Sequence, residues 1–201
     1  YFDVIPKLVD DYLTYLDKFS LEGPEARPEN PVWHIHRGRP PERTDQLSFA
    51  LLLNLASACN TEDPSVLWGF ISRYDEAASP ETAPILDKLL TYAITYYQDF
   101  VKPNKHYRSP EEQEIPALRD LAEALEAMPE GSTATEIQNE IFAVGKRNGY
   151  ENLRDWFKTL YQILLGRDQG PRMGSFVALF GIDKTIHLIS RILAGEDISR
   201  G

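Results

Sequence analysis

The chain has 201 residues, of which 42% are hydrophobic and 11% aromatic, so it can bury the core of one domain or two small ones and is not an intrinsically disordered chain. Its formal net charge of −10 counts against a general nucleic-acid-binding protein, because such proteins carry a basic surface. The single cysteine, Cys59, excludes an intrachain disulfide and a cysteine-rich zinc site, and no apolar run is long enough to span a bilayer. These features favour a cytoplasmic protein.

Apolar residues at helical spacing, together with capping residues and prolines, predict four helices in the first half of the chain. They are expected at residues 4–19, 45–59, 64–74 and about 81–101. Thr44 is expected to cap the second, whose centre is apolar nearly all round and is therefore predicted to be buried. A connection rich in Pro, Gly, Glu and Arg joins the first two at residues 20–43, with a short strand at 32–36 as an option.

The second half also predicts helices, after a polar connection at residues 102–114. They are expected at about 115–127, 135–148, 151–165, 174–180 and 183–194, separated by Gly, Pro and Asn residues. No stretch of four or more residues alternates cleanly as a β-strand does. The sequence therefore predicts an all-α fold, a multi-helix bundle or α-helical cage, in which the connection at 102–114 separates two helical subdomains.

The most distinctive stretch is Gly-Pro-Arg-Met-Gly-Ser-Phe-Val-Ala-Leu-Phe-Gly at residues 170–181. Its proline suits a first helical turn, and its glycines let the backbone approach a neighbour or a ligand closely. Arg172, at the start of the apolar run, is a candidate contact for an anion or a phosphate. The segment resembles the C-terminal signature of class I lysyl-tRNA synthetases, near the end of their anticodon-binding domain.

Three other stretches resemble the same family, so the resemblance covers most of the chain. They are a helix-like segment at 44–60 that contains Asn-Leu-Ala-Ser, the Trp-His-Ile-His-Arg loop within 31–41, and the tyrosine-rich segment 90–107. The resemblance implies a helical cage that binds an anticodon. It also implies that residues 1–40 are the linker and first helix after a catalytic domain, 41–108 a first helical subdomain, and 109–201 the anticodon-binding cage.

The resemblance further implies a fragment. The family activates its amino acid on a Rossmann domain with a His-x-Gly-His motif and a Lys-Met-Ser-Lys-Ser-type loop, and this chain, which begins at Tyr1 without a methionine, contains neither. The sequence His-Ile-His-Arg-Gly at 34–38 has its glycine misplaced for the first motif. We therefore expect no catalytic residue and no cofactor here. Lysine and ATP with magnesium would be bound only by the missing catalytic domain, and the partner of this piece would be tRNA-Lys, with no DNA and no membrane.

The charge is unevenly distributed, which indicates where RNA would bind. Residues 1–140 hold 12 Lys and Arg against 25 Asp and Glu, a balance of −13, whereas residues 141–201 hold 9 against 6, a balance of +3. Acidic residues also solvate exposed helices, so the overall charge does not decide the question. Most of the candidate RNA-binding residues therefore come from the C-terminal third. The candidates in that third are Lys146, Arg147, Arg167, Gln169, Arg172, Ser175, Lys184 and Arg191, and the two others are Arg37 and Arg39.

Several of these candidates also have an ordinary structural interpretation. Lys146 and Arg147 end a predicted helix, where cations offset the helix dipole. Lys184, His187 and Arg191 share one face of the last helix, which is either solvated or follows a phosphate backbone. The spacing of Phe176 and Phe180 favours the core over base stacking.

The arginines near residue 40 are equally open to two interpretations. Arg37, Arg39 and Arg43 lie among prolines, and guanidinium groups match phosphate oxygens. The arginines of this loop can equally pair with Glu42 and Asp45. His34 and His36 are two residues apart, but no third ligand of matching type lies nearby, so no metal site is expected.

Two other functions stay open beside anticodon recognition by a lysine–tRNA ligase. One is the related anticodon-binding cage of a glutamyl-type synthetase. The other is an acidic all-α protein-interaction domain without RNA binding, which the net charge of −10 supports. The positive balance after residue 140 opposes this second alternative.

Overall fold

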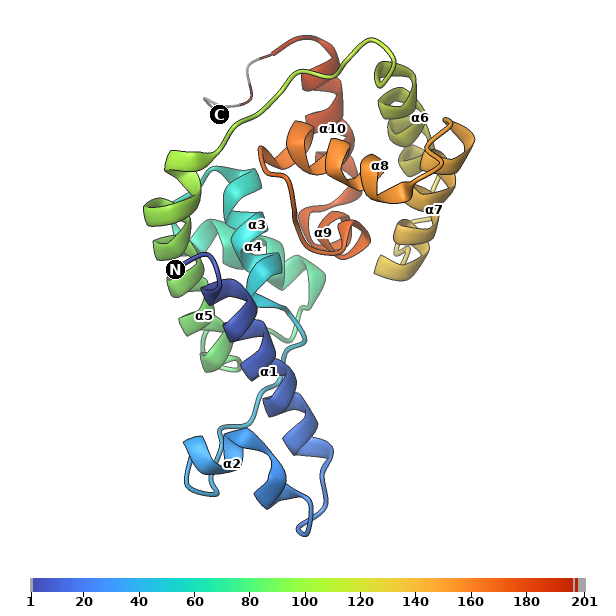
Figure 1. Ribbon diagram of the computed structural model, residues 1–201. Helices are drawn as coiled ribbons and strands as arrows, with labels where there is room; N and C mark the ends of the chain where they lie inside the picture. The colour runs from blue at the N-terminus through green and yellow to red at the C-terminus, as the bar shows by residue number, and fades with distance from the viewer. Residues whose placement is uncertain (1, 197, 199–201) are drawn as a thin grey trace.

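The prediction of an all-α fold is confirmed by the computed structural model, which describes residues 2–196 and 198 and is helical, without β-strands, in that part of the chain (Figure 1). The α-helices are α1 (Ile5–Leu21), α2 (Pro31–Ile35), α3 (Phe49–Cys59), α4 (Pro64–Tyr74), α5 (Pro84–Tyr96), α6 (Ile115–Glu126), α7 (Ala134–Arg147), α8 (Leu153–Leu160), α9 (Met173–Phe180) and α10 (Ile182–Leu193). Two 3₁₀ turns, η1 (Arg27–Glu29) and η3 (Lys102–Asn104), and two π-helical turns, η2 (Tyr97–Val101) and η4 (Tyr161–Leu165), complete the structure.

The helices form an elongated molecule with an arm at one end (Figure 1). The C-terminal part of α1 and the short α2 make the arm, α3, α4 and α5 lie in the middle, and α6 to α10 gather at the other end. A long extended connection, residues 105–114, passes from the middle helices to α6. Among the described helices, none combines the length and the apolar character needed to cross a membrane.

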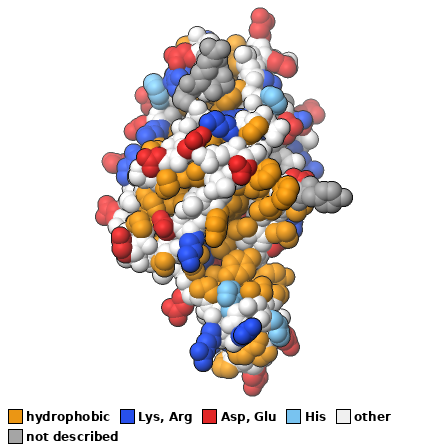
Figure 2. Space-filling view, turned by 90° about the vertical axis from the view of Figure 1, so that its left-hand side faces the viewer, with side chains coloured by type: hydrophobic (Ala, Val, Ile, Leu, Met, Phe, Trp, Pro, Cys, Tyr) orange, Lys and Arg blue, Asp and Glu red, His pale blue; other side chains and the backbone are white. Residues whose placement is uncertain are grey.

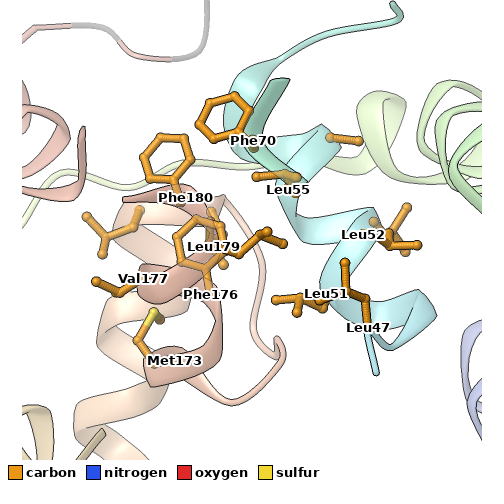
Figure 3. Close-up of a cluster of buried hydrophobic side chains, with 14 of the residues drawn as sticks. Leu47, Leu51, Leu52, Leu55, Phe70, Met173, Phe176, Val177, Leu179 and Phe180 are labelled. Carbon is orange, nitrogen blue, oxygen red and sulfur yellow. The ribbon is translucent and has the colours of Figure 1, made fainter. Parts of the chain in front are cut away.

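The hydrophobic core continues from the middle helices into the C-terminal helices. Figure 3 shows leucines of α3 and Phe70 of α4 facing the side chains of α9, including Phe176 and Phe180. The ring of Phe180 stacks on Phe70 at 5.5 Å and on Phe176 at 5.2 Å between centroids. The prediction that Phe176 and Phe180 belong to the core is therefore confirmed. Helix α9 has apolar residues nearly all round, as expected of a helix enclosed by others.

Helix α3 is buried as predicted, but it begins at Phe49 and not at residue 45. Two side chains from different segments accept hydrogen bonds from its first backbone N–H groups. The Ser48 hydroxyl accepts from Leu51 N at 3.1 Å, and the Asp10 carboxylate of α1 accepts from Phe49 N at 2.5 Å. Because these groups satisfy the free donors of the first turn, the predicted Thr44 cap is wrong. The Thr44 hydroxyl instead donates to the Thr82 carbonyl oxygen at 3.3 Å.

The connection at 20–43 contains helical turns, so the optional strand at 32–36 is wrong. Asn30 caps α2 by accepting a hydrogen bond from Val32 N at 3.0 Å, and Pro31 occupies the first turn. The Asn30 amide also donates to the Tyr15 carbonyl oxygen at 3.0 Å, which fixes the turn against α1. The Trp33 ring packs beside Phe19 of α1 at 6.2 Å between centroids.

The remaining helix boundaries agree with those predicted from the sequence to within about three residues. Helix α5 begins at Pro84, later than the expected residue 81, because Thr82 closes a turn by donating to the Ala77 carbonyl oxygen at 2.9 Å. The expected helices at 81–101 and 151–165 each end in a π-helical turn, η2 and η4. Thr133 and Glu136 form a reciprocal capping box at the start of α7.

Candidate nucleic-acid interface

The segment 166–172, which we call the signature loop, leads from η4 into α9 and is held at several points. Gly166 adopts a positive φ of 66°, and its carbonyl oxygen accepts from His106 N at 3.1 Å. Tyr161 donates its hydroxyl to the Pro171 carbonyl oxygen at 2.6 Å. A Cβ on Gly170 would lie 2.6 Å from the Tyr161 ring, so glycine is needed for this close approach. These contacts therefore hold the backbone of the loop against η4 and the connection that precedes α6.

The second glycine of the distinctive stretch, Gly174, serves helix packing. Its N–H donates to Gln138 Oε1 of α7 at 2.7 Å, and both residues are buried. A Cβ at this position would overlap the Ala134 carbonyl oxygen and lie 2.7 Å from Gln138 Cβ. The sequence left open whether these glycines approach a neighbour or a ligand, and for Gly174 the structure places a neighbouring helix there.

Arg167 and Gln169 lie on the rim of a cavity of about 390 Å³, which we call the junction cavity. Its other walls come from the start of α1, from α3 and from the end of α5 with η2 and η3. They include Asp3, Pro6, Lys7, Ala50, Leu53, Asn54, Tyr96, Phe100, Val101 and Asn104. Arg167 is half-buried, and burial lowers the pKa of its guanidinium. Within the described residues it has no carboxylate within ion-pairing distance.

Arg172 and Ser175 follow the loop but face different surroundings. Arg172 is exposed and has no ion-pair partner in the part of the chain that the structure describes. Ser175 is half-buried and lines a different cavity, together with Asp45 and Leu47. The structure therefore brings Arg167, Gln169 and Arg172 together on one loop and places Ser175 apart from them.

Lys146 and Arg147 end α7, as predicted, but have different environments. Arg147 donates to Asp120 of α6 at 2.7 Å and to Glu140 at 2.9 Å, and these hydrogen bonds raise the pKa of its guanidinium. Arg147 thus ties α6 to α7. Lys146 is exposed and, in the described residues, makes no ion pair.

Lys184 and Arg191 on α10 both contact other protein groups. The Lys184 ammonium lies 4.1 Å from the centroid of the Phe70 ring, and the residue lines a cavity of about 600 Å³ beside the turn between α6 and α7. Arg191 donates to Glu196 at 2.7 Å. His187 is exposed on the same helix.

Arg37 and Arg39 lie at the arm, far from the signature loop (Figure 1). Both are exposed, and Arg37 has a positive φ of 52°. Figure 2 shows Lys and Arg side chains on the arm, below a band of hydrophobic side chains over α1 and α5. Their neighbour Arg43 is instead buried and pairs with Asp45 at 2.7 Å and with Asp17 of α1 at 3.2 Å. Pairing with Asp45 was one of the two options from the sequence, whereas the bond to Asp17 was not predicted.

The two histidines of the arm are engaged separately. His34 Nε2 lies 2.8 Å from the Pro28 carbonyl oxygen, and His36 Nε2 lies 2.9 Å from the Tyr12 hydroxyl. The described part of the chain contains no cluster of three His, Cys, Asp or Glu side chains placed to hold a metal ion.

Sequence reasoning missed three polar residues on these surfaces. Arg154 and Lys158 are exposed cations one turn apart on α8, beside the half-buried rings of Phe157 and Tyr161. Their spacing of four residues was the signal that could have found them. Asn54 of α3 lines the junction cavity and is only 2% exposed. A buried polar residue within an apolar helix was visible in the sequence, but its neighbours across the cavity were not.

Comparison with known proteins identifies the family of this chain. Residues 79–193 match the model of the family described as "Anticodon binding domain", which is more than half of the chain. Curated relatives include lysine–tRNA ligases of Rickettsia bellii (strain OSU 85-389), 50% identical over 195 residues, and of Rickettsia felis, 50% identical over 191 residues. These alignments cover 96% and 94% of this chain but 37% and 36% of the relatives, so the chain spans little more than a third of their length. The resemblance carried by residues 170–181 is confirmed, and the chain belongs to the anticodon-binding domain family.

Proposed function

We propose that this chain is the C-terminal anticodon-binding part of a class I lysine–tRNA ligase and that it binds tRNA-Lys. The observation that carries the proposal is the 50% identity with lysine–tRNA ligases over 96% of the chain. The matched anticodon-binding domain covers the signature loop and all helices from α6 to α10. Arg172 and Lys146 in this region are exposed and make no ion pair with any described residue, which supports contacts with a phosphate backbone.

This part of the enzyme would recognise the tRNA and would not catalyse a reaction. Phosphate contacts set the position of a nucleic acid, and base contacts set its identity. Arg172, Lys146 and, on the arm, Arg37 and Arg39 have charges that no described carboxylate neutralises, so they are our first candidates for phosphate contacts. Binding energy gathered at the anticodon would help align the distant acceptor end with the catalytic domain of the full-length enzyme.

The full-length enzyme would form lysyl-adenylate from ATP, with magnesium, and would then transfer lysine to its tRNA in the cytoplasm. We propose that residues 1–40 follow the catalytic domain, that residues 41–108 form a first helical subdomain and that residues 109–201 form the anticodon-binding cage. The chain itself should neither activate lysine nor aminoacylate tRNA. ATP–pyrophosphate exchange catalysed by this chain would contradict that assignment.

Fluorescence anisotropy of this chain with labelled tRNA-Lys, at several salt concentrations, tests the proposal. We expect salt-sensitive binding that weakens when the anticodon bases are replaced. Tighter binding of tRNA-Glu than of tRNA-Lys would favour the glutamyl-type alternative. Equal binding of every tRNA would contradict anticodon reading by this part, and no binding of any tRNA would favour the protein-interaction alternative.

A further inference from the structure

Two polar side chains that line the junction cavity, Arg167 and Asn54, lack hydrogen-bond or ion-pair partners among the described residues for part of their polar groups. Arg167 of the signature loop lines the cavity, is half-buried and makes no ion pair in the described residues. A guanidinium carries five N–H donors, and a buried charge without a partner is costly. A ligand that accepts hydrogen bonds would relieve that cost.

Asn54 of α3, which also lines the cavity, has an acceptor without a donor. Its Nδ2 donates to the Ala50 carbonyl oxygen at 2.6 Å, which fixes the orientation of the amide. Its Oδ1 has no hydrogen-bond partner among the described residues, although the side chain is 2% exposed. Buried polar atoms are nearly always paired, so this acceptor, in a residue that lines the cavity, is a second unsatisfied polar group beside it.

Aromatic rings form a third part of the wall. Tyr96 and Phe100 line the cavity and lie 5.0 Å apart between ring centroids. The Tyr96 hydroxyl donates to the Phe2 carbonyl oxygen at 3.0 Å, and Phe2 stacks on Phe100 at 5.1 Å, so the rings are held in place. Asp3 and Lys7 complete this side, and Lys7 is paired with Asp11 at 2.8 Å.

A planar ligand with hydrogen-bond acceptors on its edge suits Arg167 and the aromatic rings of this cavity. Bases of single-stranded RNA are recognised by stacking on aromatic or arginine planes and by hydrogen bonds to their edges. The cavity volume of about 390 Å³ lies in the usual range for small-ligand sites. Arg172, exposed five residues beyond Arg167 on the same loop, is available to a phosphate outside the cavity.

We propose that the junction cavity holds one unstacked base of the bound RNA loop, with Arg167 donating to the base edge and with α1 and α3 supplying further parts of the cavity wall. This proposal rests on the proposed function, because it names a subsite for the same RNA. It also goes beyond the matched domain, since Asp3, Pro6, Lys7, Ala50, Leu53 and Asn54 all precede residue 79. The N-terminal helices would therefore take part in recognition, and not only in support.

Affinity measurements with four RNAs test the proposal. They are an anticodon stem-loop of tRNA-Lys and three versions in which one anticodon base at a time is replaced by an abasic site. Each is titrated against the wild-type chain and against Arg167→Ala, Arg167→Lys and Asn54→Leu. Arg119→Ala is the matched control, because Arg119 of α6 is exposed, lies outside the cavity and makes no ion pair in the described residues.

We expect Arg167→Ala to lower affinity for the intact stem-loop about tenfold or more, as for other hydrogen bonds to a charged group. The loss should vanish with one of the abasic RNAs, and Asn54→Leu should show a smaller loss at the same position. Arg167→Lys, which keeps the charge but not the planar fork, should still lose affinity for the intact loop. Circular dichroism of each variant confirms that the helices are retained.

Two results would overturn the inference, one obtained with the RNAs and one with a free nucleotide. If Arg167→Ala weakens all four RNAs equally, Arg167 only contacts phosphate, and the cavity holds no base. If wild-type protein binds no RNA, the proposed function fails, and titration with uridine 5′-monophosphate then decides about the cavity. Shifts of the Arg167 Nε–H and Asn54 amide resonances on that titration would still support a base site, whereas unchanged resonances would refute it.

Discussion

The backbone N–H of Gly174 donates to Gln138 Oε1 at 2.7 Å, where α9 crosses α7. This bond joins a buried amide side chain to the first turn of the helix that carries the distinctive sequence, and both groups lie in the core. Close contact of the two helices depends on the absence of a side chain at residue 174. The motif that identified the family is thus partly a packing motif.

Gly174→Ala should destabilise the fold by about 1–3 kcal/mol, because the new methyl group meets backbone atoms that cannot move independently of α7. The free energy of unfolding in urea measures the effect. Gly69→Ala is the matched control, since Gly69 lies on an exposed part of α4, where a methyl group would have no other atom within 4 Å. That change should leave stability unchanged or raise it by up to about 1 kcal/mol. Equal stability of the two variants would contradict the packing argument.

Arg43→Ala should cost about 3–5 kcal/mol, because it leaves the buried Asp45 carboxylate without its ion-pair partner. The side chains of Arg43 and Asp45 are only 4% and 6% exposed, and Arg43 also bonds Asp17 and the Leu47 carbonyl oxygen. Chemical denaturation at pH 7 measures the loss. The exposed pair Lys7–Asp11 provides the comparison, and Lys7→Ala should cost less than about 1 kcal/mol. A similar cost for both variants would argue against a structural role for the buried pair.

Local sequence signals were enough for most of the fold. Asp63, Thr133 and Asn152 cap their helices because the capping residue and the N–H groups that it satisfies are neighbours in the chain. The start of α3 could not be predicted in this way. Its first N–H groups are satisfied by Asp10, which lies 39 residues earlier in the chain, and no local pattern contains that pairing.

The candidate site was only partly predictable for the same reason. Arg167, Gln169 and Arg172 were found because one short segment carries them, and they do lie on one loop. The junction cavity also needs Asn54 and Tyr96, which reach it only through the packing of α3 and α5. Arg147 looked like an RNA contact from its charge, but its guanidinium is engaged by Asp120 from another helix. Charge and spacing thus identify candidates, and tertiary partners decide which of them have free charges.

Lys105 should make the stability of the protein depend on pH in the alkaline range. Its ammonium donates to the Ser57 carbonyl oxygen at 2.5 Å and lies near the Tyr107 ring, and burial lowers its pKa from 10.5 to about 8. Between these two values the unfolded chain binds a proton that the folded chain has released, so the contribution of Lys105 to stability rises with pH from about 8 to 10.5.

The comparison of wild type with Lys105→Met isolates this effect, because tyrosine titrations occur in both proteins and cancel. Urea unfolding at pH 7, 8, 9 and 10 should show wild type gaining stability relative to the variant at each step. A difference between the two proteins that stays constant with pH would mean that Lys105 titrates normally in the fold.

Arg172→Ala should weaken binding of tRNA-Lys several-fold and should lower the slope of log affinity against log salt concentration by about one, as expected for the loss of one phosphate contact. The exposed guanidinium of Arg172 makes no ion pair in the described residues, so its removal should leave the fold intact. Arg119→Ala removes an equal charge from α6 and should leave the slope unchanged. Fluorescence anisotropy between 50 and 200 mM salt gives both slopes. A loss of affinity without a change of slope would instead assign Arg172 to a base, and equal slopes with equal affinities would remove it from the interface.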